Sequence, residues 1–127
     1  ELQRDLGLAM IFIAHDLAVV RQLCHRVLVM YDGAVMEQAG RERLFAAPLH
    51  PYTSALMSAV PGSGIAAPAS LTATELRPSK AIDQVTVGCR YRDRCVNADD
   101  YCGQALPALR RVAPEHFAAC HFIAAAL

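Results

Sequence analysis

The chain has 127 residues, of which 54% are hydrophobic and 19% are charged, and its 12 basic and 12 acidic side chains cancel. A chain of this length and composition can bury a core, which excludes a disordered protein. No basic patch stands out to bind the phosphates of a nucleic acid, and no stretch approaches the roughly 18 apolar residues of a membrane-spanning helix.

The first predicted elements lie on either side of Gly7. Residues 1–6 have the pattern of the last turns of a helix, so we expect the chain to be a piece of a longer protein. Residues 8–14, Leu-Ala-Met-Ile-Phe-Ile-Ala, are continuously apolar. A run of this length without polar alternation is typical of a strand buried on both faces, as in a parallel sheet covered by helices.

A helix and then a β-hairpin are predicted next. Asp16 can cap the helix, because its side chain can accept hydrogen bonds from the free N–H groups of the first turn. The apolar face of this helix, at spacings of three and four residues, consists of Leu17, Val20, Leu23 and Cys24. Residues 27–31 and 34–39 then form two antiparallel strands, because Asp32-Gly33 between them is a favoured two-residue hairpin turn.

Two short helices and a cysteine-rich segment complete the chain. Residues 41–46 form one helix, and a second begins at Pro51, because proline suits the first turn of a helix. Residues 61–79 are rich in Gly, Ala, Ser, Thr and Pro, which indicates a linker. We therefore divide the sequence into an α/β part over residues 1–47, a helix with the linker over 48–84, and a cysteine-rich extension over 85–127.

His15 stands directly after the apolar run and before the predicted helix. In an open α/β sheet, ligands bind at the carboxyl ends of the strands. A neutral imidazole at that position can donate a hydrogen bond to an anionic oxygen, which would position a terminal phosphate for transfer. Position alone leaves open a second interpretation, in which the histidine merely packs against the following helix or caps it.

Residues 7–20 resemble the switch-histidine region of ABC transporter ATPases, and residues 26–33 and 36–40 resemble the segments downstream of that histidine in the family. The resemblance implies an α/β fold, the C-terminal piece of a P-loop ATPase domain, with His15 in contact with the γ-phosphate of ATP. Ala14 replaces the usual Ser or Thr, and His25 replaces a common acidic residue. Neither difference affects His15 itself.

A second motif narrows the resemblance. Residues 44–61, which include His50-Pro51-Tyr52-Thr53, resemble a stretch specific to the ATPases of oligopeptide and dipeptide transporters, and nickel-importing relatives share much of it. Physically, the His-Pro-Tyr sequence builds a rigid entrance to a helix, so we assign these residues a structural role. The resemblance then covers residues 1–61.

Four of the five cysteines lie in the extension: Cys89, Cys95, Cys102 and Cys120. The protein should face the reducing cytosol, where disulfides are disfavoured. Zinc sites usually take pairs of ligands two to four residues apart, which this spacing lacks, whereas an iron–sulfur cluster is larger and is also held by four thiolates. The spacing leaves a cluster, zinc and unliganded buried thiols all open.

The resemblance favours the cluster. The pattern that runs from Cys89 to Ala119-Cys120-His121 is similar to the C-terminal extension of peptide-transporter ATPases, some of which carry a [4Fe–4S] cluster on four such cysteines. We assign Cys24 to the core. We expect His116 and His121 to lie at the surface or just outside the ligand set.

The resemblance also implies cofactors and partners. The complete subunit would bind ATP and Mg²⁺ at the cytoplasmic face of the cell membrane, together with a second ATP-binding subunit, membrane subunits and, indirectly, a peptide-binding protein. The 127 residues contain no Gly-x-x-x-x-Gly-Lys-Ser/Thr phosphate loop, so we expect no ATP hydrolysis by this chain alone. Without neighbouring strands, Ile11 and Ile13 would be exposed. The alternative is a stand-alone metal-binding module or a degenerate remnant of such an ATPase.

Overall fold

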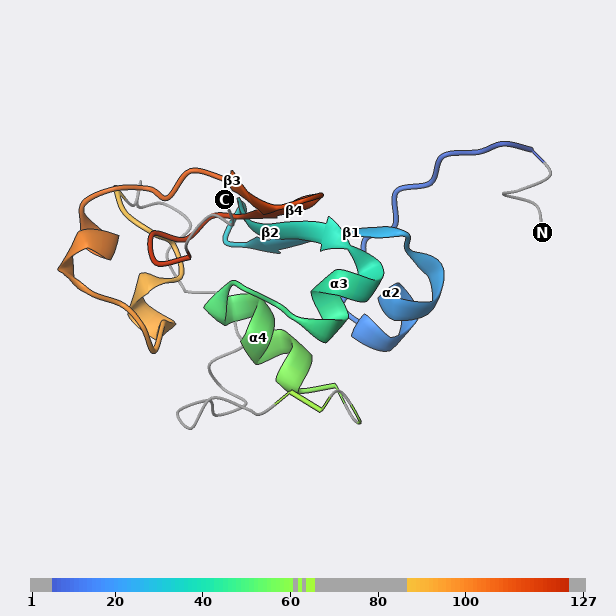
Figure 1. The fold of residues 1–127 in the computed structure, drawn as a ribbon, viewed down its shortest axis with the longest axis horizontal. Coiled ribbons are helices and arrows are strands. Elements are labelled where there is room, and N and C mark those ends of the chain that lie inside the picture. Colours follow the sequence, from blue (N-terminus) through green and yellow to red (C-terminus); the bar gives the residue numbers. More distant parts are fainter. Residues whose placement is uncertain (1–5, 61, 63, 66–86, 124–127) are drawn as a thin grey trace.

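The computed structural model describes residues 6–60, 62, 64–65 and 87–123. Its centre is a four-stranded sheet in the order β1-β2-β4-β3. The strands are β1 (Arg26–Tyr31), β2 (Ala34–Gly40), β3 (Arg110–Ala113) and β4 (His116–Ala118). Three helices lie on one side of the sheet (Figure 1): α2 (Leu17–Leu23), α3 (Arg41–Ala46) and α4 (Pro51–Ser58).

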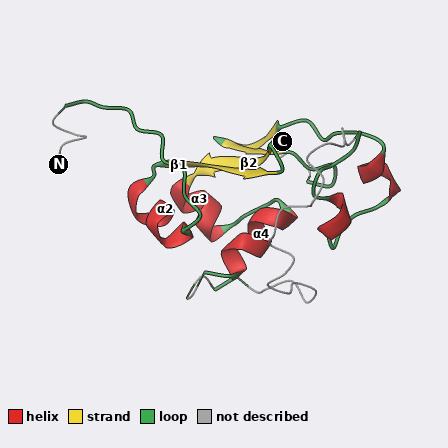
Figure 2. Cartoon of the chain, turned by 180° about the vertical axis from the view of Figure 1, so that it is seen from behind, coloured by secondary structure: helices red, strands yellow, loops and turns green. Residues whose placement is uncertain are grey.

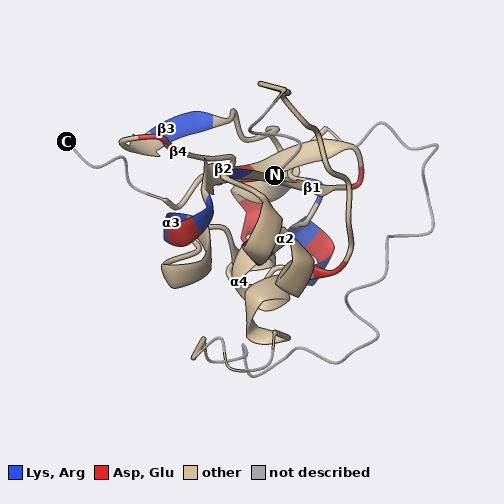
Figure 3. Cartoon of the chain, turned by 90° about the vertical axis from the view of Figure 1, so that its right-hand side faces the viewer, with Lys and Arg blue, Asp and Glu red and all other residues tan. Residues whose placement is uncertain are grey.

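Two segments of the chain extend beyond the sheet at its opposite ends (Figure 2). Residues 6–15 extend away from the sheet at one end. At the other end, the chain between residues 87 and 109 forms loops with two short 3-10 helices, η2 (Arg92–Arg94) and η3 (Asp100–Gly103). Figure 3 shows basic and acidic residues interspersed on α3 and the loops, which agrees with the even charge balance of the sequence.

Asp16 begins α2, as the sequence predicts. One oxygen of its carboxylate accepts hydrogen bonds from two N–H groups of the first turn, at 2.8 and 3.3 Å. Val20 is buried, and Leu17 and Cys24 pack against the core. Leu23 is 60% exposed, so the predicted apolar face is wrong at this residue, which is the last of the helix.

The β1–β2 hairpin and its turn are confirmed. Asp32 and Gly33 have φ angles of +48° and +74°, the left-handed values that a two-residue hairpin turn requires. Along β1, exposed and buried residues alternate, as expected for a strand with one face on a core. A register shift between Val29 and Met30 marks a bulge in the pairing of the two strands.

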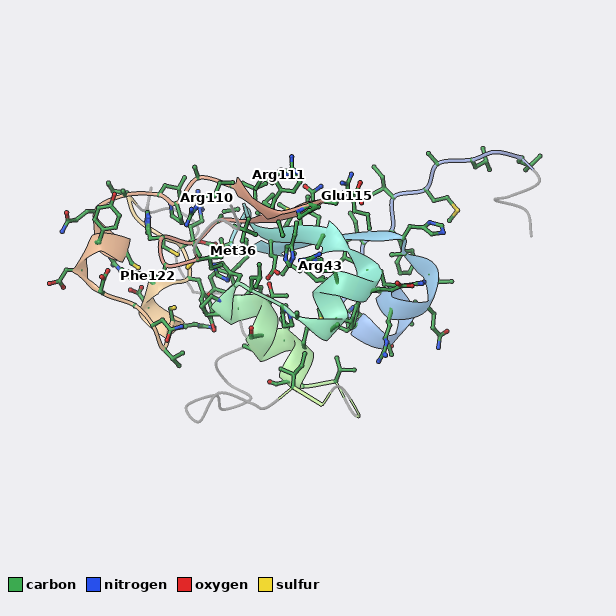
Figure 4. All side chains as sticks on the ribbon, in the orientation of Figure 1. Met36, Arg43, Arg110, Arg111, Glu115 and Phe122 are labelled. Atoms are coloured by element: carbon green, nitrogen blue, oxygen red, sulfur yellow. The ribbon has the colours of Figure 1, made fainter. Side chains whose placement is uncertain are left out.

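The C-terminal strands extend the sheet formed by the hairpin. β4 pairs with β2, with Phe117 opposite Gln38. β3 then pairs with β4 after a turn in which Glu115 has a φ of +54°. Figure 4 shows Arg111 on this part of the sheet, away from the helices. The segment after the first three cysteines of the extension is therefore built onto the hairpin.

The core between the sheet and the helices has two parts. The larger part consists of the buried residues Val20, Val27, Val29, Ala39, Leu44 and Met57. The smaller part consists of Tyr31, Met36 and Tyr91. Tyr52 of α4 packs against both parts, so this helix connects the main core with the loops at the end of the molecule.

Residues 8–14 do not form the predicted buried strand. They are exposed, and the side chains of Ile11 and Ile13 are each 95% exposed, as expected for a piece without neighbouring strands. A strand needs a hydrogen-bonding partner, and none of the four strands in the described residues pairs with this run. The described chain is a small α/β fold, as expected, with helices on one side of a four-stranded sheet. All of the strand pairs described are antiparallel, so the parallel pairing expected for residues 8–14 is not found among them.

Two predictions fall largely outside the described residues. Of the predicted helix over residues 1–6, only Leu6 is described, and of the predicted linker over 61–79, only residues 62, 64 and 65. Among the helices that are described, none has the length and apolar character needed to cross a membrane.

Candidate functional site

The histidine that the sequence emphasises lies between the exposed segment and α2. His15 is exposed and immediately precedes Asp16, the N-cap of the helix. Because residues 8–14 form no strand, the expected strand end before His15 is not formed in this structure. The predicted contact of its side chain with a phosphate stays a prediction.

The four cysteines of the extension are gathered at the looped end of the molecule. Cys102 is buried, and Cys89, Cys95 and Cys120 are half-buried. The N–H of Cys89 donates to the carbonyl of Cys102 at 2.7 Å. Cys95 is close enough to the other three cysteines for the charge of their thiolate forms to raise its pKa. Among the residues that the structure describes, no group of three or more His, Cys, Asp or Glu side chains is placed to hold a metal ion.

Backbone N–H groups are directed at two of these thiols. Burial raises the pKa of the Cys89 thiol, two of the other thiols add to the rise, and hydrogen bonds from the backbone of Tyr91 and Arg92 oppose it. Burial likewise raises the pKa of Cys95, against a hydrogen bond from the backbone of Asn97. Because an N–H group that points at sulfur favours the thiolate, this backbone suits an anionic sulfur ligand.

Gly88 allows the cysteine-bearing turns to approach each other, and Gly103 lies beside the end of the Arg92 side chain. A Cβ added at Gly88 would lie 2.2 Å from the carbonyl oxygen of Cys102, and one added at Gly103 would lie 2.6 Å from Nη1 of Arg92. Neither glycine has a positive φ. Position 88 needs glycine for space, because the atoms in the way belong to the backbone of Cys102 and Gly103, whereas the obstacle at position 103 is the end of the flexible Arg92 side chain.

A cluster of aromatic rings connects the cysteines with α4. The ring centroids of Tyr31, Tyr52 and Tyr91 lie 4.8, 5.1 and 5.2 Å apart, with tilted or edge-on geometry. Cys89 and Cys95 pack against the same cluster. The loops that carry the cysteines are therefore in direct contact with the helix of the His-Pro-Tyr-Thr sequence.

The residue after Cys89 anchors the loops to the hairpin turn. Nη1 of Arg90 donates to the carbonyl of Asp32 at 2.7 Å and lies 3.6 Å from its carboxylate. Both side chains are partly buried, with exposures of 34% and 16%. This polar contact and the tyrosine cluster fix the cysteine loops to the β1–β2 turn at two points.

A buried polar network lies where β2, β4 and the entrance of α4 meet. Glu37 and His116 are 0% exposed, and His50 is 1% exposed. The Glu37 carboxylate accepts hydrogen bonds from the N–H groups of Leu49 and His50, both at 2.9 Å. Nε2 of His116 lies 2.6 Å from Oε1 of Glu37, within hydrogen-bonding distance. One carboxylate thus joins three segments of the chain. Met36, which directly precedes Glu37 in β2, is labelled in Figure 4 and marks where this network lies.

His50 is held as a neutral ring in a fixed orientation. Its Nδ1 accepts the N–H of Tyr52 at 3.1 Å, which caps α4. Burial lowers the pKa of His50 to about 4, against the charge of Glu37 and a hydrogen bond to the backbone of Ala119. Because Nδ1 is the acceptor, Nε2 carries the proton and donates to the Ala119 carbonyl. His50 therefore links the entrance of α4 to the end of β4.

The sequence indicates the rigid entrance of α4 but not its polar centre. An acidic residue in the middle of a predicted hairpin strand is the available signal for Glu37, and its partners are distant in sequence. Of the two positions expected for His116, at the surface or just outside the ligand set, the surface position is wrong, because this residue is buried against Glu37. His121 is half-buried, with Nε2 2.9 Å from the carbonyl of Ala105, and Cys24 packs against the core as predicted.

A comparison with family models matches residues 36–102 to the family described as the oligopeptide/dipeptide transporter, C-terminal region. The matched residues begin in β2, include the His-Pro-Tyr-Thr sequence and end at Cys102. They therefore contain most of the buried network and three of the four cysteines of the extension.

Curated relatives match almost the whole chain. A putative peptide import ATP-binding protein of Brucella ovis is 47% identical over 124 residues, which cover 94% of this chain and 38% of the relative. The oligopeptide transport ATP-binding protein AppF of Bacillus subtilis is 41% identical over 124 residues, which cover 95% of this chain and 37% of the relative. The chain thus spans less than two fifths of the length of either relative.

Proposed function

Because the chain belongs to the family of oligopeptide/dipeptide transporter C-terminal regions, we propose that it is the C-terminal part of an ATP-binding subunit that powers the import of oligopeptides or dipeptides. The observation that carries this proposal is the match of 94–95% of the chain to peptide import and oligopeptide transport ATP-binding proteins. The partners would be a second ATP-binding subunit, the membrane subunits and, indirectly, a peptide-binding protein. The subunit would lie at the cytoplasmic face of the cell membrane.

His15 is the proposed contact to the γ-phosphate of ATP. Its exposed position directly before the N-cap of α2 supports this role, because nothing in the described fold covers the ring. An imidazole N–H can donate to a phosphate oxygen and help to place it for transfer. The phosphate loop and the ligands of Mg²⁺ would come from the rest of the subunit, so the 127-residue chain alone would not hydrolyse ATP.

ATP hydrolysis and peptide uptake by the complete transporter test this role of His15. We expect His15→Ala to slow ATP hydrolysis by about 100-fold or more, the usual effect of removing one donor to the reacting charge. His25→Ala, which alters a nearby exposed histidine, should retain activity and is the matched control. Equal activity of the two variants would contradict the assignment of His15. Peptide uptake that persists without the subunit would contradict the transporter proposal itself.

Cys89, Cys95, Cys102 and Cys120 are the proposed ligands of a [4Fe–4S] cluster. Their proximity and the N–H groups directed at Cys89 and Cys95 support a set of thiolates. Zinc sites usually take pairs of ligands two to four residues apart, which the spacing of these cysteines lacks, whereas a cluster is larger and is also held by four thiolates. When bound, the cluster would cross-link the cysteine-bearing turns, and electron transfer is not required.

Anaerobic purification followed by analysis of iron, sulfide and zinc tests the cluster. We expect about four iron and four sulfide ions per chain. Cys102→Ser should abolish both, whereas Cys24→Ser should retain them, because Cys24 packs against the main core away from the other cysteines. Stoichiometric zinc without sulfide would support a zinc site instead. A chain with neither metal would overturn the metal site altogether.

A second candidate function is a stand-alone metal-binding module that retains the end of an ATPase. It is favoured by the packing of the cysteine loops and of β3–β4 onto the hairpin, which gives the described part of the chain a sheet of its own. The coding sequence upstream of Glu1 distinguishes the two candidates. A phosphate loop in the same reading frame supports the transporter subunit, and its absence supports the module.

A further inference from the structure

We propose that Glu37 couples the entrance of α4 to the C-terminal strands, so that these two segments open and close as one unit. Glu37 is a positioning residue, because it acts through the backbone of Leu49 and His50 and through the ring of His116. This role goes beyond the proposed transport function. It rests on the buried contacts alone and requires neither nucleotide nor metal.

Both oxygens of the carboxylate are occupied by groups from distant parts of the chain. Oε2 accepts the N–H of His50, and Oε1 accepts the N–H of Leu49 and also lies 2.6 Å from Nε2 of His116. Pro51, the next residue, has no N–H, so the groups of Leu49 and His50 are the last backbone donors before α4. The position of the helix entrance is therefore set from one side chain of β2.

Burial makes these contacts interdependent. The side chains of Glu37 and His116 are fully buried, so a donor that loses its partner finds no water while the sheet stays closed. If β4 moves away, the carboxylate loses one partner and water reaches the other two. If the entrance of α4 moves away, His116 faces a carboxylate that has lost its backbone donors.

A second contact runs in parallel with the first. The ring of His50 is hydrogen-bonded to the backbone of Ala119, and the N–H of Ala119 donates to the carbonyl of Met36 at 2.8 Å. Cys120 comes directly after Ala119. A displacement of the C-terminal strands would thus reach the helix entrance in two ways, through the contact of His116 with Glu37 and through the contact of Ala119 with His50. The second contact lies next to Cys120, a proposed ligand of the cluster.

Amide hydrogen exchange of the full 127-residue chain, resolved by residue, tests the coupling. His116→Phe keeps a flat ring but removes the nitrogen that meets Glu37. We expect exchange at Leu49 and His50 to become about tenfold faster, although His116 bonds neither amide, and exchange in β4 to rise with it. His121→Phe, which leaves Glu37 untouched, should not change exchange at these amides, and α2 should keep its rates in both variants.

Glu37→Gln is the second variant. An amide accepts through only one of its two terminal atoms, so the N–H of Leu49 or of His50 must then face another donor. We expect faster exchange in both segments, and no change in Glu42→Gln, which alters an exposed acid on α3.

The outcome of His116→Phe decides the proposal. The proposal is overturned if this variant accelerates exchange only in β3 and β4 while Leu49, His50 and α4 keep their original rates. His116→Gln is a further test of the same contact, because its amide can still donate to Glu37. This variant should protect Leu49 and His50 better than His116→Phe does, and equal rates in the two would also overturn the coupling.

Discussion

The exposed segment, residues 6–15, and the buried network, Glu37, His50 and His116, reverse the usual relation between polarity and burial. Ile11 and Ile13 are 95% exposed, whereas Glu37 and His116 are 0% exposed. The described chain offers no strand to pair with the exposed segment. In the network, by contrast, Glu37 of β2 is hydrogen-bonded to His50 at the entrance of α4 and to His116 of β4. In these two regions, burial therefore follows the availability of hydrogen-bonding partners and not hydrophobicity alone.

The largest expected effect comes from removing the centre of the buried network. Glu37→Ala leaves two N–H groups and a histidine without their acceptor, and we expect a loss of about 3–5 kcal/mol of unfolding free energy. Urea denaturation measures this loss. Glu42→Ala, at an exposed acid of α3, should cost little by comparison. Similar values for the two variants would show that the network contributes no more than the surface does.

Acidification should weaken the same network. The pKa of His50 is lowered from 6.5 to about 4, so between these values the unfolded chain binds a proton that the folded chain does not. This contribution to stability is complete above about pH 6.5 and falls until about pH 4, by about 3 kcal/mol in total. Denaturation at a series of pH values measures it. His50→Asn keeps a capping oxygen but has no titrating ring, so its stability should vary less over this range. An unchanged slope would refute the assignment to His50.

The boundary between the two regions should show an intermediate effect. Asp16 begins α2 immediately after the exposed segment, and Asp16→Ala removes a side-chain cap worth about 1 kcal/mol. Amide exchange in α2 should become faster, while exchange in β2 and β4 should not change. If β2 and β4 also respond, the boundary between the regions does not lie at Asp16.

The exposed segment should show the smallest effect. The double substitution of Ile11→Ser and Ile13→Ser should change the unfolding free energy by less than about 0.5 kcal/mol, because neither side chain is buried. Removing this exposed apolar surface should also raise solubility. A large loss of stability would mean that the segment packs against the protein in solution, and the contrast between the two regions would then disappear.

Elements with local signals were predictable from the sequence, and long-range pairings were not. The cap at Asp16, the turn at Asp32-Gly33 and the helix start at Pro51 each depend on a few adjacent residues, and all three are found. The predicted strand over residues 8–14 depends on neighbouring strands that the described chain does not supply. No periodicity could have indicated that Glu37 meets His116, because 79 positions separate the two residues.

Gly33 and Gly88 are glycines for different reasons, and they should differ in which replacements they tolerate. Gly33 provides a left-handed turn residue, so asparagine is an acceptable substitute there. At Gly88 the obstacle is the carbonyl oxygen of Cys102, a backbone atom that no change of rotamer can move aside. In a library of all substitutions at position 88 that is selected for folded protein, we therefore expect every variant, including alanine, to be depleted. The same depletion is expected in a background where all four cysteines of the extension are replaced by serine. Such a background would separate selection for the shape of the turn from selection for the ligands that it carries.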